Sequence, residues 1–181
     1  MKKLLIFLSA MTLALLFLAA VGPAQEAGPA KAGAGVQLGT FDSRVIAIAY
    51  YRSDQFKEHV ADIRTQHDAA KKAGDQKTMD RLEKMMSEQQ TVTHQQGFGT
   101  APIPEILKLV EKEIPELALQ AGVDVVVCKW DLLYQNPSST STDLSLTLAE
   151  QFNPDAATRK ILAQMLTTDP VPMAELEGHV D

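Results

Sequence analysis

The residues able to carry chemistry are few and lie far apart in this chain. The 4 histidines do not have the spacing of two metal ligands on one helical turn, and no Cys/His pair pattern is present. They are His59, His67, His94 and His179. His59 and His67 are eight residues apart and share a helix face only loosely. We therefore predict neither a metal site nor a cofactor.

Cys128 is the only cysteine, so it cannot form a disulfide within the chain. It ends a valine-rich run, where a free cysteine usually serves as a small buried residue. A nucleophilic thiol requires a neighbouring histidine or cationic group, and the sequence alone does not identify one. A structural role for Cys128 is the simpler interpretation.

An acidic run on one predicted helix has an equally simple explanation, a solvated face, and consists of Glu105, Glu111, Glu113 and Glu116. The chain also lacks a phosphate-binding loop, a nucleophile elbow and a dinucleotide-binding fingerprint. We predict that the protein is not an enzyme. A reaction that uses Cys128 or a His/Asp pair is the alternative.

The composition argues against one class of partner. The 181 residues suffice for one domain with a modest core, and the formal net charge is −6. Proteins that bind nucleic acids usually carry a basic patch, and no basic cluster occurs in this sequence. Aromatic residues make up 6% of the chain, too few for a platform on which bases stack. We predict no nucleic-acid partner.

Residues 1–24 have the layout of a secretory signal peptide. Lys2 and Lys3 precede the apolar run Leu4–Ala20, and small residues continue to Ala24, after which cleavage is expected. The apolar run is only just long enough to span a bilayer, so an uncleaved membrane anchor is the alternative. We predict export to the periplasm or otherwise out of the cytoplasm, with no integral membrane span after cleavage.

The rest of the chain divides into three parts. Residues 25–35 are rich in Ala, Gly and Pro and predict a flexible linker. The folded domain is expected at 36–168, and residues 169–181 are expected to form a frayed tail. The domain opens with a predicted strand, Val36–Phe41, followed by a helix that Asp42 or Ser43 caps.

A helical arm is predicted at about residues 53–96, and its first helix is expected to continue without a break from the apolar turns near Val45 through Ala73. Its apolar positions alternate in steps of four and three, as in a coiled-coil seam, at Phe56, Val60, Ile63, His67 and Ala70. Gly74 suits the end of this helix and Asp75 the start of a second. We predict an antiparallel hairpin; one continuous helix with a tolerated glycine is the alternative.

The second helix of this hairpin has an apolar face that consists of Met79, Leu82, Met85, Met86 and Gln89. Methionine side chains are flexible and polarisable, which suits an adaptable contact surface. The alternative is that these methionines simply fill the seam of the hairpin.

Beyond the hairpin, Gln96–Pro102 contains two glycines and a proline and predicts a loop. Ile103–Ala121 predicts a helix that Pro115 kinks or splits. Two short buried strands with a turn between them are then expected, at Val123–Cys128 and Leu132–Tyr134.

Two short helices complete the predicted domain. Thr142 or Asp143 is expected to cap the helix Leu144–Phe152. Asn153 is expected to cap the last helix, with Pro154 at its first position. Its apolar face comprises Ile161, Leu162, Met165 and Leu166.

The order of these features resembles the Skp/OmpH family of periplasmic chaperone-like proteins. The residues that carry the resemblance are Val125-Val126-Val127, Leu133-Tyr134, Asn136-Pro137, Thr142-Asp143 and the strand–helix junction Phe41-Asp42-Ser43-Arg44-Val45. The similarity covers about residues 36–152. It implies an α+β fold in which a small β body carries a projecting antiparallel helical hairpin arm.

The resemblance also implies a function. It predicts a homotrimer that acts as an ATP-independent holdase-type chaperone or scaffold and encloses unfolded or envelope proteins with its arms. The predicted client-binding residues are Phe56, Val60, Ile63, Met79, Leu82, Met85 and Met86. The predicted oligomer and core residues of the body are Phe41, Val45, Val125, Val127, Leu133 and Tyr134. The alternative is a non-chaperone structural protein of the envelope that binds one specific partner.

Overall fold

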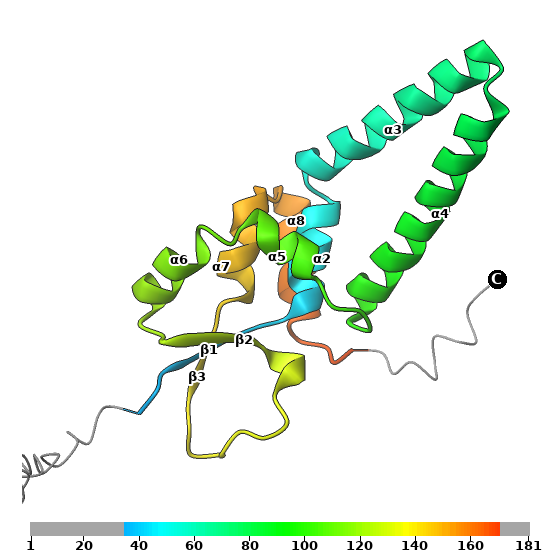
Figure 1. The fold of residues 1–181 in the computed structure, drawn as a ribbon. Coiled ribbons are helices and arrows are strands. Elements are labelled where there is room, and N and C mark those ends of the chain that lie inside the picture. Colours follow the sequence, from blue (N-terminus) through cyan, green and yellow to red (C-terminus); the bar gives the residue numbers. More distant parts are fainter. Residues whose placement is uncertain (1–34, 171–181) are drawn as a thin grey trace, which may run out of the picture. The chain divides into compact units, whose positions relative to one another are not determined.

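The computed structural model describes residues 35–170, and their fold is α+β (Figure 1). The predicted signal peptide, most of the predicted linker and residues 171–181 lie outside the described residues. The strands are β1 (Leu38–Phe41), β2 (Val125–Cys128) and β3 (Ser141–Asp143). The α-helices are α2 (Ser43–Tyr51), α3 (Asp54–Ala73), α4 (Gln76–Phe98), α5 (Pro104–Leu109), α6 (Ile114–Ala121), α7 (Ser145–Ala149) and α8 (Ala156–Met165). Two 3-10 turns, η1 (Lys129–Asp131) and η2 (Glu150–Phe152), complete the described part of the fold.

The sheet has three strands in the order β2-β1-β3, and β1 runs parallel to both neighbours. Leu38 lies opposite Val125 on one side and opposite Ser141 on the other. Glycine suits the next position of β1, because a Cβ on Gly39 would lie 3.0 Å from Val123 Cγ2 and 3.1 Å from Leu144 Cδ1. The centre of the sheet is therefore packed tightly against the chain segments that flank β2 and β3.

The predicted strand at Leu132–Tyr134 is wrong, and the third strand is Ser141–Asp143 instead. A strand that follows β2 through a tight turn would have to run antiparallel to it. The sheet is parallel, so the chain leaves it at η1 and returns through the loop 132–140 (Figure 1). The polar residues of β3 gave no strand signal because all three are exposed.

The core of the domain lies between one face of the sheet and the helices α2, α5, α7 and α8. The buried apolar side chains of α2 are Val45, Ile46, Ala47 and Ala49, and those of the other elements include Ile106, Leu148, Phe152 and Leu162. We call the sheet together with α2 and α5–α8 the body. Among the predicted body residues, Phe41 and Val45 are buried, Val127 is half-buried, and Val125, Leu133 and Tyr134 are exposed.

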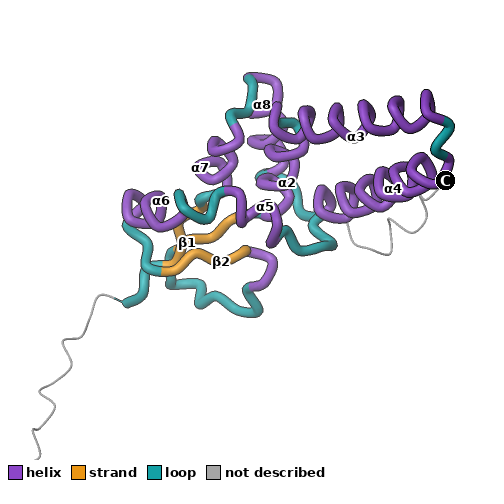
Figure 2. Tube along the Cα trace, turned by 45° about the horizontal axis from the view of Figure 1, so that its top comes forward, coloured by secondary structure: helices purple, strands orange, loops and turns teal. Residues whose placement is uncertain are grey.

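Helices α3 and α4 run side by side in opposite directions (Figures 1 and 2). The predicted turn is confirmed, because Gly74 adopts a left-handed φ of 69° at the end of α3 and the Asp75 side chain accepts the Thr78 N–H at the start of α4. The helix does not continue from Val45 to Ala73 as predicted. It breaks at Arg52-Ser53, where the Ser53 hydroxyl caps α3 by accepting the Phe56 N–H. We call these two helices the α3–α4 pair.

Two other local predictions have mixed outcomes. The helix 103–121 is split as Pro115 predicted, with α5 ending at Leu109 and α6 starting at Ile114. Asn153 does not cap the last helix; it takes a left-handed φ of 51°, and Asp155 caps α8 two residues later. Pro154 is buried ahead of the helix instead of occupying its first position.

Leu144 occupies the cap position of α7, and the Asp143 carboxylate accepts the Ser145 N–H at 2.8 Å. The predicted residue therefore satisfies a backbone donor at this helix start without being the cap residue itself. Within residues 35–170, no helix combines the length and the apolar character needed to cross a bilayer.

Candidate functional site

The junction between β1 and α2 contains a buried carboxylate, Asp42. As the sequence predicted, its side chain caps α2 by accepting the Arg44 N–H at 3.0 Å. Its own backbone N–H donates to the Ser145 hydroxyl of α7 at 2.8 Å. Asp42 thus joins the central strand, the first helix and the start of α7 at one point.

Three side chains from two distant parts of the chain donate to the Asp42 carboxylate. Arg44 reaches both oxygens, with Nε 3.1 Å from Oδ1 and Nη2 2.8 Å from Oδ2. Lys129 Nζ lies 3.0 Å from Oδ2, and Trp130 Nε1 donates to Oδ1 at 2.9 Å. Both cations also face the Trp130 ring, at 5.0 Å for Arg44 and 4.4 Å for Lys129. We call Asp42, Arg44, Lys129 and Trp130 the Asp42 cluster.

The Asp42 cluster also holds the end of α8. Arg44 Nη2 donates to the carbonyl of Thr168 at 2.7 Å and to that of Met165 at 3.4 Å. Burial alone would raise the pKa of Asp42, but the hydrogen bonds from Arg44, Trp130 and Lys129 outweigh it and lower the pKa below its ordinary value. An ionised carboxylate whose oxygens are already bonded is poorly placed to transfer protons. The cluster is arranged to join elements of the body.

A groove of about 510 Å³ lies beside the Asp42 cluster. Its walls come from the end of β1, from β2, from η1 and from the segment that joins α4 to α5. Apolar side chains dominate these walls, among them Phe41, Ile103, Leu107, Val126 and Trp130. Cys128 also lines the groove and is half-buried. The volume of this groove falls within the range of ligand-binding clefts, and its lining is mostly apolar.

The loop that follows η1 exposes two large side chains next to this groove. Leu133 is 101% exposed and Tyr134 is 76% exposed. Figures 1 and 2 show the loop 132–140 on the side of the sheet opposite the helices. Strand β2, whose valines line the groove, lies at the edge of the sheet among the described residues. Apolar side chains gathered on a surface in this way usually mark a contact with another molecule.

The α3–α4 pair holds the predicted client-binding residues, and it buries only some of them. Ile63 and Leu82 are buried between the two helices. Phe56, Val60, Met79 and Met86 are half-buried, Phe56 against the rings of Tyr50 and Tyr51 of α2, and Met85 is 36% exposed. Val92, which was not among the predicted residues, lies two helical turns after Met85 and is 37% exposed. We call these residues, with Ile63 and Leu82, the seam.

A ring cluster and a polar cluster connect the α3–α4 pair to the body. The Phe56 ring lies 5.3 Å from that of Tyr50 and 4.8 Å from that of Tyr51. Gln96 of α4 is buried; it accepts from the Tyr51 hydroxyl and donates to the Pro102 carbonyl at 2.7 Å and to Glu105. Burial raises the pKa of both tyrosines, and the protonated Tyr51 hydroxyl is the donor to Gln96. The C-terminal part of α4 is thereby fixed to α2 and to the start of α5.

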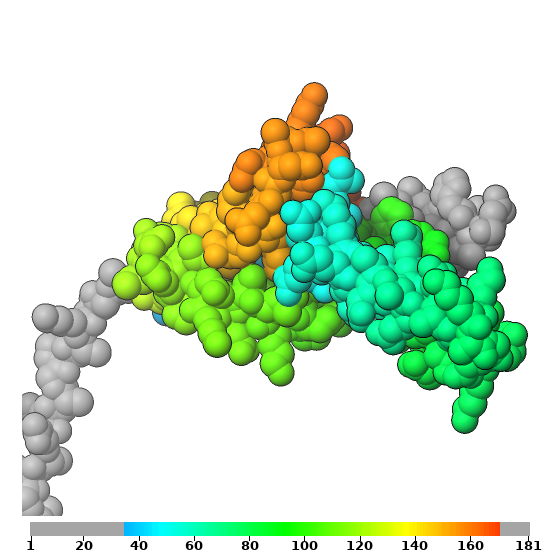
Figure 3. Space-filling model, turned by 90° about the horizontal axis from the view of Figure 1, so that it is seen from above, coloured from blue at the N-terminus to red at the C-terminus, as the bar shows by residue number. Residues whose placement is uncertain are grey.

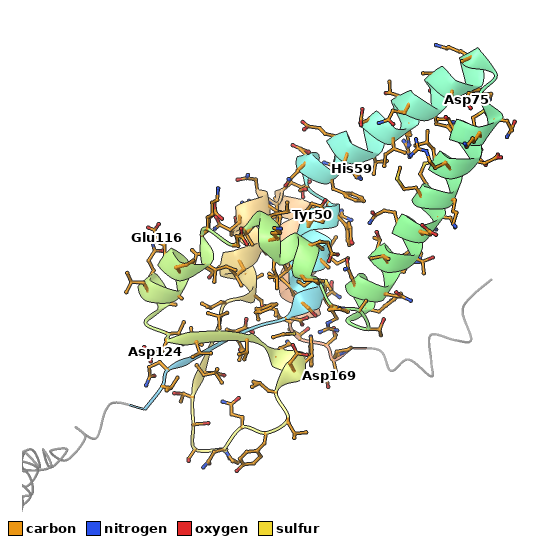
Figure 4. All side chains as sticks on the ribbon, viewed as in Figure 1. Tyr50, His59, Asp75, Glu116, Asp124 and Asp169 are labelled. Atoms are coloured by element: carbon orange, nitrogen blue, oxygen red, sulfur yellow. The ribbon has the colours of Figure 1, made fainter. Side chains whose placement is uncertain are left out.

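Within residues 35–170, the histidines His59, His67 and His94 do not belong to any group of metal ligands. His59 is exposed near the α2 end of α3, while Asp75 marks the far end of the pair (Figure 4). His67 Nε2 lies 3.1 Å from Glu83 across the pair. No group of three or more possible metal ligands occurs in the part of the chain that the structure describes.

Asp42 was predicted as a helix cap, but its partners could not be recognised from the sequence. Lys129 and Trp130 were assigned to a turn, and Ser145 was not predicted to have any role. Gln96 was predicted to begin the loop Gln96–Pro102, but it lies within α4, which continues to Phe98. One signal was present in the sequence, because Trp130 is the only tryptophan and directly follows a lysine. A lone amphipathic tryptophan usually takes a hydrogen-bond partner when it is buried.

The space-filling view shows that α7 and α8 (orange) and α5 and α6 (yellow-green) form one face of the body (Figure 3). Comparisons of this chain with protein-family models, with curated proteins and with solved structures found no match. The geometry of the groove, the loop and the seam is thus the basis for assigning a function.

Proposed function

We propose that this protein is an exported, ATP-independent holdase-type chaperone or scaffold, similar to the Skp/OmpH family, that binds unfolded or envelope proteins as a homotrimer. The α3–α4 pair serves as its arm. The observation that carries the proposal is the incompletely buried seam, in which apolar side chains line a pair of helices too thin to cover them.

Within the described residues, α2 packs against the body ends of both helices, and the rest of the apolar seam has no third helix over it. Only Ile63, Ala70 and Leu82 are buried apolar residues within the α3–α4 pair. The remaining seam residues keep part of their surface in water, which favours contact with an apolar segment of another chain. Three of them are methionines, whose flexible side chains adapt to partners of different shape.

The outer faces of the pair suit a carrier of apolar clients. Exposed charges of both signs alternate along them, including Lys57, Arg64, Lys84 and Glu88. Such a surface stays hydrated while the seam is occupied, so a loaded complex remains soluble. Binding of this kind needs no nucleotide, because it depends on burial of apolar surface alone.

The test is an aggregation assay with the mature protein from Gln25 onward. A urea-denatured client is diluted with and without the protein, in the absence of nucleotide, and light scattering is followed. We expect the protein to suppress scattering at stoichiometric ratios. The double variant M85Q/V92T removes apolar surface without changing side-chain size much, and we expect it to bind the client roughly tenfold more weakly.

Gln90→Ser, an exposed change on the same helix, is the matched control and should leave suppression unchanged. Circular dichroism must show the same helix content in all variants. Equal suppression by M85Q/V92T and the natural chain would exclude the seam as the client site, and no suppression by any variant would exclude the holdase function.

The groove supports the second candidate function, a scaffold that binds one specific partner. Its volume of about 510 Å³ and its mostly apolar lining suit one peptide better than many unrelated clients. A single saturable partner, captured equally well by M85Q/V92T, would favour this function over the holdase.

A further inference from the structure

We propose that the C-terminal segment Val171–Ala174 docks into the groove beside β2 of its own chain. This inference goes beyond the proposed function, because it assigns the groove an occupant that any partner of the groove must displace. The chain's own segment is favoured by the place where the described chain ends, by the apolar match between segment and groove, and by the short tether between them.

The described chain ends at the rim of the groove. Arg44 Nη2 donates to the Thr168 carbonyl at 2.7 Å, and the same guanidinium faces the ring of Trp130, which lines the groove. Two residues further on, Pro170 is half-buried. A Cβ on Gly99, which also lines the groove, would lie 3.9 Å from Pro170 Cβ. The next residue of the chain therefore starts within one residue's reach of the groove wall.

The groove runs along the outer edge of β2. Val126, Val127 and Cys128 all line it, although consecutive side chains of a strand point to opposite faces of the sheet. A groove that touches all three therefore follows the edge of the strand. In the part of the chain that the structure describes, β2 is an edge strand, and an edge strand can pair with a further extended segment. The groove thus suits a peptide backbone with apolar side chains.

The sequence that follows Pro170 matches this groove. Val171–Ala174 reads Val-Pro-Met-Ala and carries no charge, and acidic residues begin only at Glu175. Proline at positions 170 and 172 disfavours a helix and is compatible with an extended backbone. Four extended residues span up to about 13 Å, at about 3.3 Å each. This length is sufficient to cross a groove of about 510 Å³.

The tether favours this segment over a separate molecule. One valine and one methionine bury too little surface to hold a second protein, since stable interfaces bury roughly 1,200–2,000 Å². A segment attached beside its site acts at an effective concentration in the millimolar range, so a weak contact is enough to keep it bound. The same two side chains on another copy lack this advantage.

Cys128 makes the docking directly testable, because it lines the groove and is the only cysteine of the chain. The variant Met173→Cys of the mature protein places a second thiol in the segment. The protein is oxidised with copper phenanthroline, and its unreduced peptides are analysed by mass spectrometry. A disulfide requires Cα atoms within about 7 Å. We expect the bond to form within one chain, roughly tenfold or more faster than in the control V180C, whose thiol lies further along the same tail.

A mixture of the natural chain with C128S/M173C tests the tail of a second copy as the occupant. Each chain then has one thiol, so the disulfide between positions 128 and 173 forms only between copies. We expect its yield to be at most about a tenth of the yield within one chain. Equal yields would assign the groove to a second copy, and equal rates for M173C and V180C would mean that the segment does not dock. Either result would overturn the inference.

The fluorescence of Trp130, the only tryptophan, supplies an independent measurement in the reduced protein. The variant V171D/M173D places two charges in the segment and changes no residue of the body. We expect its emission maximum to shift to longer wavelength and its acrylamide quenching constant to rise, because water and quencher then reach the ring. The matched control V180D should keep both natural values. Emission and quenching unchanged in V171D/M173D would contradict docking of the segment.

Discussion

The body and the α3–α4 pair are both rich in helix, but they differ in how completely they bury their apolar side chains. The body buries an apolar core that includes Ile46, Ile106, Leu148 and Leu162, and it joins its elements through the Asp42 cluster. The pair buries three apolar side chains and leaves the rest of its seam partly in water. Most of the buried apolar core therefore lies in the body, and the pair leaves a larger share of its apolar side chains partly exposed.

The largest expected effect is on the Asp42 cluster. Asp42→Asn keeps the shape of the side chain but leaves the buried Arg44 and the neighbouring Lys129 without their counter-charge. Removing one partner of a buried ion pair costs about 3–5 kcal/mol. We expect a loss of free energy of unfolding near the lower figure, measured by urea denaturation.

Asp54→Asn is the control for that experiment. Asp54 also pairs with a cation, Lys57 at 2.7 Å, but both side chains are exposed. Its free energy of unfolding should stay within about 0.5 kcal/mol of the natural chain. Similar losses for the two variants would mean that the Asp42 cluster does not hold the body together.

Leu82→Ala should have a smaller and more local effect. Leu82 is the largest fully buried side chain within the pair, and truncating a buried leucine costs about 2–5 kcal/mol. The neighbours in a two-helix seam can collapse into the gap, so we expect the low end of that range. Hydrogen exchange should rise in α3 and α4 and stay unchanged in α2 and α7. A uniform rise through the body would contradict the separation of the two regions.

Acid should weaken the body through Asp42. Because the pKa of Asp42 in the fold lies below its ordinary value of 3.8, its ionised form stabilises the fold fully above that value. This contribution is lost as the pH falls through the lowered pKa. We expect the free energy of unfolding to drop across this range, and to drop less in D42N. Parallel acid dependence of the two proteins would show that other carboxylates are responsible.

The smallest predicted effects have opposite signs at two glycines. Gly74 has a φ of 69° and a Cβ there would meet nothing within 4 Å, so Ala costs about 1 kcal/mol through backbone strain alone. Gly97 lies inside α4, where Ala is favoured by up to about 1 kcal/mol and would contact Ile48 Cδ1 at 3.4 Å. The midpoint temperature of thermal unfolding should be higher for G97A than for the natural chain, and lower for G74A.

The sequence predicted the parts of the fold that local signals determine. Gly74 and Asp75 marked the turn between α3 and α4, Asp42 marked the start of α2, and Pro115 marked the split of the 103–121 helix. In each case the residues that impose the structure lie within one helical turn of it. The break at Arg52-Ser53 was missed because apolar periodicity continues across it.

The parts that were missed depend on distant partners. Trp130 is 88 residues from the Asp42 carboxylate to which it donates, and nothing near either residue reports the contact. Leu132–Tyr134 is apolar, as strands often are, but it cannot join a parallel sheet directly after β2. Ser141–Asp143 is polar, yet it pairs with β1 as the third strand. Local propensity therefore failed where sheet topology decided the outcome.

The parallel sheet sets the order in which this chain can mature. Its central strand, β1, comes first along the described chain, and its pairing partners start at Val125 and Ser141. During synthesis, β1 must wait for nearly the whole domain to emerge before it can pair. Such long-range pairing is slow to form. The sheet of the body therefore forms only after β2 and β3 have been synthesised, late in the production of the domain.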